Sequence, residues 1–162
     1  MKMKLKTILA IGALAVLPLT AAAQLPQGGP GIAVAGSVSP AELPQKAQEF
    51  LSKYYPQQQC ASLMKEFTDN EYELRMTDGT EVTFFADGRI DEIEAPKGGI
   101  LPLEVIKALL PEKSFRHLND NGYLGMVNEI DYKSNGYKVS LKTNTPDDIT
   151  YSLTGDVVEI DY

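Results

Sequence analysis

Apolar residues recur at helical spacing between Leu43 and Pro56, and the positions between them are polar or charged. This pattern is typical of an amphipathic helix that buries one face. Pro44 favours the start of the helix, because proline fits a first helical turn, and Pro56 ends it. The apolar stripe of the expected helix consists of Leu43, Ala47, Phe50, Leu51 and Tyr54.

Alternation of apolar and polar residues follows the helix and predicts strands. Residues 72–77 alternate, Asp78-Gly79 turns the chain, and alternation resumes over residues 81–85, which is a β-hairpin signature. Asp87-Gly88 marks a second turn before a short acidic segment. The four expected strands span residues 60–67, 72–77, 81–85 and 89–94.

The second half of the chain repeats the pattern of the first, which is the most informative internal feature of the sequence. Three strand segments match: 72–77 with 137–142, 82–85 with 149–152, and 87–94 with 154–161. Leu43-Pro44 matches Leu110-Pro111, so residues 112–118 are expected to form the second unit's helix, after a short additional helix over 103–110. The predicted units span residues 40–96 and 97–162, joined at Lys97-Gly98-Gly99.

One such unit cannot comfortably bury its sheet under a single short helix, whereas two units side by side can share a core. We therefore predict an α+β fold in which two four-stranded antiparallel meanders form one sheet of about eight strands, with the helices on one face. The residues expected to face the helices are Tyr72, Leu74, Met76, Val82, Phe84, Tyr137, Val139, Leu141, Ile149, Tyr151 and Leu153. The opposite face is expected to present Glu73, Arg75, Thr83, Phe85, Lys138, Ser140, Thr150 and Ser152 to solvent.

The first 23 residues have the order of parts of a secretory signal peptide. A leader with Lys2, Lys4 and Lys6 precedes an apolar stretch over residues 8–19, which is too short to span a bilayer, and small residues end at Ala23. We predict cleavage near Ala23 and a periplasmic or secreted protein without a membrane span. Residues 24–39, rich in Gly, Pro and Ala, are interpreted as a flexible spacer.

The net charge of the chain limits the classes of molecule that are expected to bind it. The full chain has a net charge of −7, and loss of the three leader lysines lowers it to −10. Such a surface repels nucleic acid and anionic lipid, so neither is an expected partner. The acidity suits a basic protein partner, but it is equally a common means of solubility, and both interpretations stay open. Cys60 is the single cysteine, so the chain has no internal disulfide, and a small buried apolar role is expected for it.

Two segments resemble a known family. The helix motif Ala47-x-x-Phe50-Leu51-x-x-Tyr54-Tyr55-Pro56 and the hairpin from Tyr72 to Phe84, which closes on Asp87-Gly88, are similar to the PepSY-like, β-lactamase-inhibitor-like proteins exported by Bacteroides-type bacteria. The resemblance implies tandem helix-loop-helix plus four-stranded sheet units and a kinship with domains that inhibit or chaperone peptidases. Arg89-Ile90 departs from the family pattern, which often has an aromatic residue there. The disulfides of the known inhibitor have no counterpart in this chain.

No catalytic set is recognisable in the sequence. His117 is the only histidine, and its place on an expected helix favours a helix-surface or core-edge role. The chain has no Gly-x-Ser-x-Gly elbow, no His/Cys metal spacing and no glycine-rich phosphate loop. Glu92 and Glu94 are interpreted as solvated acids of a short strand. We therefore predict no catalytic residue, no cofactor and no metal site, and a protein that is not an enzyme.

The polar sheet face and the hairpin turns are the predicted protein-binding surface. It comprises Glu73, Arg75 and Thr83, with Phe85 as an exposed aromatic beside them and Asp78 at a projecting turn. Alternatively, Phe85 packs against the neighbouring unit and Asp78 has only a turn role. A second functional hypothesis is a small-ligand or envelope-stress sensor with its site between the two units, near Gly98-Gly99 and Tyr123.

Overall fold

The computed structural model describes residues 38–66, 70–143 and 146–162. The predicted signal peptide and residues 24–37 of the predicted spacer lie outside the described residues. The elements of the first half are η1 (Pro40–Glu42), α1 (Gln45–Tyr54), β1 (Cys60–Glu66), β2 (Glu71–Met76), β3 (Glu81–Phe84) and β4 (Ile90–Glu94). Those of the second half are α2 (Leu103–Leu109), α3 (Glu112–Asp120), η2 (Leu124–Met126), β5 (Val127–Lys133), β6 (Gly136–Leu141), β7 (Asp148–Ser152) and β8 (Val157–Asp161).

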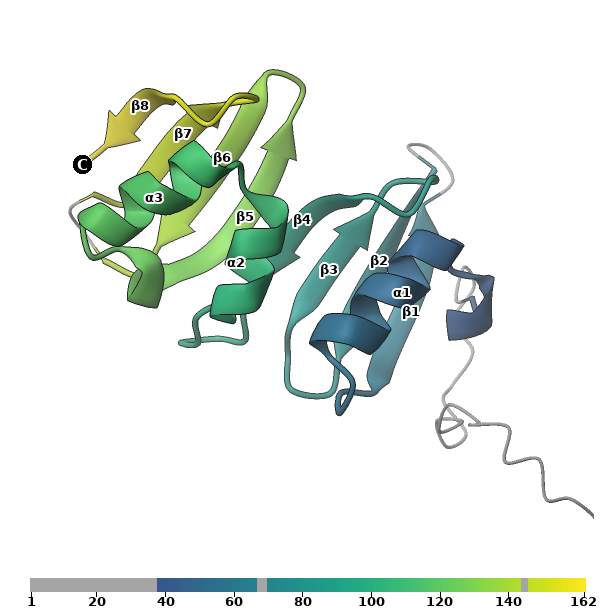
Figure 1. Ribbon diagram of the computed structural model, residues 1–162. Helices are drawn as coiled ribbons and strands as arrows, with labels where there is room; N and C mark the ends of the chain where they lie inside the picture. Colours follow the sequence, from purple (N-terminus) through teal and green to yellow (C-terminus); the bar gives the residue numbers. More distant parts are fainter. Residues whose placement is uncertain (1–37, 67–69, 144–145) are drawn as a thin grey trace, which may run out of the picture.

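The eight strands form one sheet in chain order, and each strand pairs antiparallel with the next. The helices α1, α2 and α3 lie on the same face of the sheet (Figure 1). In the first half α1 lies in front of β1 and β2, and in the second half α2 lies beside β4 and β5 while α3 lies in front of the strands that follow. The α+β fold with tandem meanders in a single sheet is therefore confirmed. The pairing of β4 with β5, in which Ile93 lies opposite Ile130, makes the two meanders continuous.

The core lies between the helices and the sheet, and the period of two decides which strand residues enter it. Leu74, Val82 and Phe84 are buried in the first half, as are Val139, Leu141, Ile149 and Tyr151 in the second. Cys60 is half-buried and packs against this core. One predicted core residue is wrong: Leu153 is 49% exposed, because β7 ends at Ser152 and Leu153 begins the turn to β8.

Two glycines make the same contact in the two halves. Gly88 (φ +80°) lies in the β3–β4 turn, and a Cβ atom there would lie 2.9 Å from Cβ of Pro44, beside the start of α1. Gly155 (φ +85°) lies in the β7–β8 turn, where a Cβ atom would lie 2.9 Å from Cβ of Pro111, beside the start of α3. Only glycine permits both this backbone conformation and this close approach. The turns therefore fix the helices on the sheet in equivalent ways.

Candidate functional site

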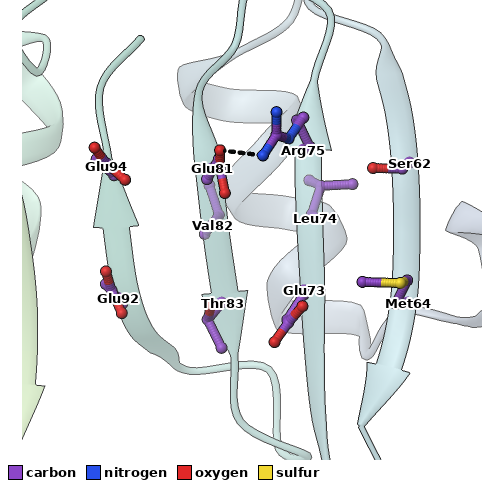
Figure 2. Close-up of a pocket in the computed structure, with 10 residues that line it drawn as sticks. All are labelled: Ser62, Met64, Glu73, Leu74, Arg75, Glu81, Val82, Thr83, Glu92 and Glu94. Atoms are coloured by element: carbon purple, nitrogen blue, oxygen red, sulfur yellow. Dashed lines mark ion pairs between the residues drawn. The ribbon is translucent and has the colours of Figure 1, made fainter. Parts of the chain in front are cut away.

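A shallow hollow of about 290 Å³ lies on the face of β1 to β4 opposite α1 (Figure 2). Its lining residues are Ser62, Met64, Glu73, Leu74, Arg75, Glu81, Val82, Thr83, Glu92 and Glu94. Most of them alternate with buried residues along their strands, so the pleat that fills the core also presents these side chains on the polar face. Figure 2 shows the acidic side chains on this face of the strands, with the helix behind them.

Three of the five predicted site residues come together in the hollow. Glu73 lies directly opposite Thr83 in the β2–β3 register, and Arg75 lies opposite Glu81. A terminal nitrogen of Arg75 lies 2.6 Å from Oε1 of Glu81, and both side chains are about half exposed. The polar face is thus organised by strand register rather than by a loop. Asp78 is separate from these residues, in the β2–β3 turn, where its Oδ1 atom accepts a hydrogen bond from the backbone N–H of Thr80.

Phe85 is not beside Glu73, Arg75 and Thr83, and this part of the prediction is wrong. Its half-buried ring packs edge-on against Tyr132 of β5, with 6.0 Å between ring centroids, and the Arg89 guanidinium lies 5.2 Å from the Phe85 centroid. The alternative interpretation, packing against the second unit, is the one that the structure shows. The physical reason is that β3 ends at Phe84 and the β3–β4 register shifts there, so strand alternation no longer orients residue 85.

An acidic band missed by the sequence analysis runs across the junction of the two halves. We use this name for Glu81, Glu92, Glu94, Glu129 and Asp131. Three pairs in it stand directly opposite one another on neighbouring strands: Glu81 with Glu94, Glu94 with Glu129, and Glu92 with Asp131. The prediction of eight strands includes a first strand for the second unit but assigns it no residues, so the carboxylates of β5 cannot be placed beside those of β4 from the sequence.

Two acids of the band, Glu92 and Glu129, have raised pKa values. Burial raises the pKa of Glu92, and the charges of Glu129 and Asp131 raise it further. Burial and the charge of Glu94 likewise raise the pKa of Glu129. Nearby lysines compensate in part: Lys133 pairs with Asp131, and Lys138 lies 2.8 Å from Asp148 on β7. The band therefore keeps an excess of negative charge that a cationic group would stabilise.

The only histidine lies away from this surface. Nδ1 of His117 on α3 lies 2.9 Å from the hydroxyl oxygen of Tyr151, at the edge of the core on the helix side of the sheet. Of the two expected roles, helix surface and core edge, this contact corresponds to the second. Among the described residues, no three His, Cys, Asp or Glu side chains are grouped so that they could hold a metal ion. In the same part of the chain, no helix has the length and apolarity needed to cross a membrane.

Comparison with known proteins identifies the family. The sequence profile described as "Putative beta-lactamase-inhibitor-like, PepSY-like" matches residues 33–92 and again residues 70–159. The chain belongs to this PepSY-like family. The resemblance seen in the helix and hairpin motifs is therefore confirmed. No curated protein matches the chain.

Solved structures share the fold of this PepSY-like chain. A "putative calcium-regulated periplasmic protein" from Bacteroides thetaiotaomicron has a TM-score of 0.66 at 23% identity, and the alignment covers 78% of this chain and 95% of that one. A "putative periplasmic protein of unknown function" from Bacteroides vulgatus has a TM-score of 0.64, also at 23% identity, with 78% and 100% covered. Both relatives are described as periplasmic, and at this identity the likeness establishes the fold alone.

Proposed function

We propose that this PepSY-like chain is an exported, non-enzymatic binding module that holds a basic protein surface against the acidic band and the adjoining hollow. The observation that carries the proposal is the register of β3, β4 and β5, which sets carboxylates directly opposite carboxylates. Like charges directly opposite one another destabilise a sheet, so this arrangement costs folding free energy. A partner with Lys or Arg side chains would reduce that repulsion, and this reduction would add to the binding free energy.

The hollow, which Glu81, Glu92 and Glu94 of the band also line, adds an apolar contact to the charged surface. Met64 is 45% exposed on the edge strand β1, opposite Glu73, and its flexible side chain adapts to different contact shapes. Arg75 and Glu81 form an exposed ion pair, which contributes little to stability and can rearrange at low cost when a partner arrives. Protein-binding surfaces commonly combine apolar contacts with charged groups, and Met64 lies beside the charged side chains of β2 and β3.

The family description supports a finer proposal about the partner. Since the family is described as β-lactamase-inhibitor-like, the favoured partner is a secreted or envelope hydrolase or peptidase whose activity falls on binding. The periplasmic description of the solved relatives is compatible with export through the proposed signal peptide and cleavage near Ala23. The partner and this chain would then meet in the same compartment.

The test uses the chain without its proposed signal peptide, residues 24–162, as bait for envelope proteins of the native organism. Wild type is compared with the double variant Glu92→Lys/Glu94→Lys. The matched control is Glu159→Lys/Asp161→Lys, which makes the same charge change on the exposed strand β8. Any retained protein is then purified, and its affinity for the three baits is measured at low and high salt, together with its enzymatic activity.

The expected result is a partner with a basic surface that binds wild type and the β8 control alike. It should bind the Glu92/Glu94 variant at least about tenfold more weakly, and its binding should weaken with salt. Equal affinity for all three baits, or retention of no specific protein, would overturn the proposal. Binding without loss of the partner's activity would remove the inhibitory role and leave the binding role in place.

A further inference from the structure

A second cavity, of about 430 Å³, lies on the helix side of the sheet where the two halves meet. It is bounded by α1, α2 and strands β4 to β6, and Figure 1 shows α1 and α2 on this same face, one in each half. Its apolar wall includes Phe50, Leu109, Ile130, Tyr132 and Tyr137. We call it the seam cavity. Its volume falls within the range of about 300–1,000 Å³ that is common for small-molecule sites.

The rings of the seam cavity are fixed by one another. Tyr132 packs edge-on against Phe85 on one side and against Tyr137 on the other, with ring centroids 6.0 and 5.5 Å apart. Such edge-to-face pairs hold aromatic side chains in defined positions. The cavity wall is therefore preorganised, and a ligand with an apolar body would lose little binding free energy to ordering the protein.

Two cationic side chains of the first half line the seam cavity. The residues at the equivalent positions of the second half form an ion pair. In the second half, Nζ of Lys113 lies 2.9 Å from Asp156, the residue after Gly155. The equivalent residues of the first half are Lys46, two residues after Pro44, and Arg89, the residue after Gly88. Lys46 and Arg89 both line the seam cavity. A lysine–aspartate pair in one half thus corresponds to a lysine–arginine pair in the other.

Arg89 contacts one acidic and two aromatic side chains beside the cavity. Its Nε atom donates to Oδ2 of Asp87 over 2.7 Å, and its guanidinium lies 5.2 Å from the ring centroid of Phe85 and 6.0 Å from that of Tyr132. The planar guanidinium group suits the recognition of a planar anion such as a carboxylate. Asp87 offsets the charge of Arg89, and among the described residues no ion-pair partner is found for the ammonium group of Lys46.

We infer that the seam cavity binds a small-molecule carboxylate with an apolar body. The carboxylate group meets Lys46 and Arg89, and the apolar body lies among Phe50, Tyr132 and Tyr137. None of the residues expected from the sequence for a site between the units, Gly98, Gly99 and Tyr123, lines this cavity. The inference is independent of the proposed protein-binding role, because the acidic band lies on the opposite face of the sheet.

Asp91 also lines the seam cavity and provides a test of the ligand's charge. The charges that act on its carboxyl group are those of Asp131 and Lys133 on β5. A ligand carboxylate would be repelled by Asp91, whereas a ligand cation would be attracted. Asp91→Asn should therefore leave the affinity for a carboxylate unchanged or raise it, and it would lower the affinity for a cation.

The experiment titrates residues 24–162 with decanoate and with its uncharged analogue methyl decanoate, using two-dimensional NMR and calorimetry. Decanoate is expected to shift resonances of Phe50, Tyr132 and Tyr137. Arg89→Ala and Lys46→Ala should each weaken its binding by about five- to tenfold, and methyl decanoate should bind at least about tenfold more weakly than decanoate. Lys113→Ala is the matched control, since it removes the equivalent lysine outside the cavity, and it should leave the affinity unchanged.

Folding of each variant is checked by its thermal unfolding temperature and by the dispersion of its NMR spectrum. Three results would overturn the inference: no binding of decanoate at millimolar concentration, equal binding of the methyl ester, or equal effects of Lys46→Ala and Lys113→Ala. Resonance shifts confined to other parts of the molecule would also overturn it, because they would place the bound acid outside the seam cavity.

Discussion

In the second half, the side chain of His117 contacts the hydroxyl group of Tyr151. At the equivalent positions of the first half, Phe50 packs against Phe84. The His117 and Tyr151 rings are 5.7 Å apart at 72°, and the Phe50 and Phe84 rings are 6.4 Å apart at 73°. The two halves thus keep one edge-to-face geometry, made of apolar rings in one and of hydrogen-bonding rings in the other. Burial raises the pKa of Tyr151, so its hydroxyl stays protonated and needs a hydrogen-bonding partner.

This relationship predicts a non-additive pair of substitutions. His117→Phe alone should lower the free energy of unfolding by about 2 kcal/mol, because it leaves the buried Tyr151 hydroxyl without its partner. Tyr151→Phe alone should cost about 1 kcal/mol. The double variant reproduces the apolar pair of the first half and should be more stable than His117→Phe alone. Urea unfolding followed by circular dichroism measures the cycle, and simple additivity of the two losses would refute the coupling.

The acidic band predicts a pH-dependent gain of stability on neutralisation. The pKa of Glu92 in the folded protein lies above its ordinary value of 4.5, so ionisation of Glu92 favours the unfolded state. Below pH 4.5 the Glu92→Gln variant should be as stable as wild type. As the pH rises through the raised pKa, wild type should lose stability relative to the variant, by about 0.5 kcal/mol for one cross-strand pair.

The measurement is the difference in the free energy of unfolding between Glu92→Gln and wild type from about pH 4 to about pH 8. Glu159→Gln on β8 provides the matched control, because Glu159 lies opposite the neutral Thr150, and it should show a smaller gain. A difference that stays constant across the pH range would show that Glu92 is not repelled by its neighbours.

The surroundings of Gly88 and Gly122 predict different losses in the free energy of unfolding when each glycine is replaced by alanine. Gly88→Ala should lower the free energy of unfolding by about 1 kcal/mol for its left-handed backbone, and by more because the added Cβ meets Pro44. At Gly122 (φ +74°) a Cβ atom would have no atom within 4 Å apart from those of Gly122 and its two chain neighbours, so Gly122→Ala measures the backbone cost alone. Denaturant unfolding of both variants gives the difference, and equal losses would show that the β3–β4 turn does not press on α1.

The helices and most strands could be predicted because their signals are local. Pro44 and Pro56 mark the ends of one helix, and Asp78-Gly79 marks a hairpin, whatever the rest of the chain does. The β5 strand could not be recognised in the same way. The register shift between Val127 and Glu129 breaks the period of two, so its buried residues, Val127 and Ile130, are spaced by three.

The parts of the candidate site that lie within one hairpin could be predicted from the sequence, and the parts that depend on distant strands could not. Glu73, Arg75 and Thr83 follow from alternation within one hairpin, and the structure brings them together in one hollow. Phe85 lies past the end of its strand, and its position depends on Tyr132, far along the chain. The acidic band and the seam cavity likewise depend on the pairing of β4 with β5, which no single segment of sequence reveals.

The continuity of the sheet across β4 and β5 has a consequence for aggregation. Two separate four-stranded sheets would each expose two edge strands, whose unpaired backbone groups can recruit strands from other molecules. The pairing of Glu92, Ile93 and Glu94 with β5 removes two of these edges, so the sheet that the structure describes ends only at β1 and β8. The same join that crowds carboxylates together therefore halves the number of open edges available for intermolecular pairing.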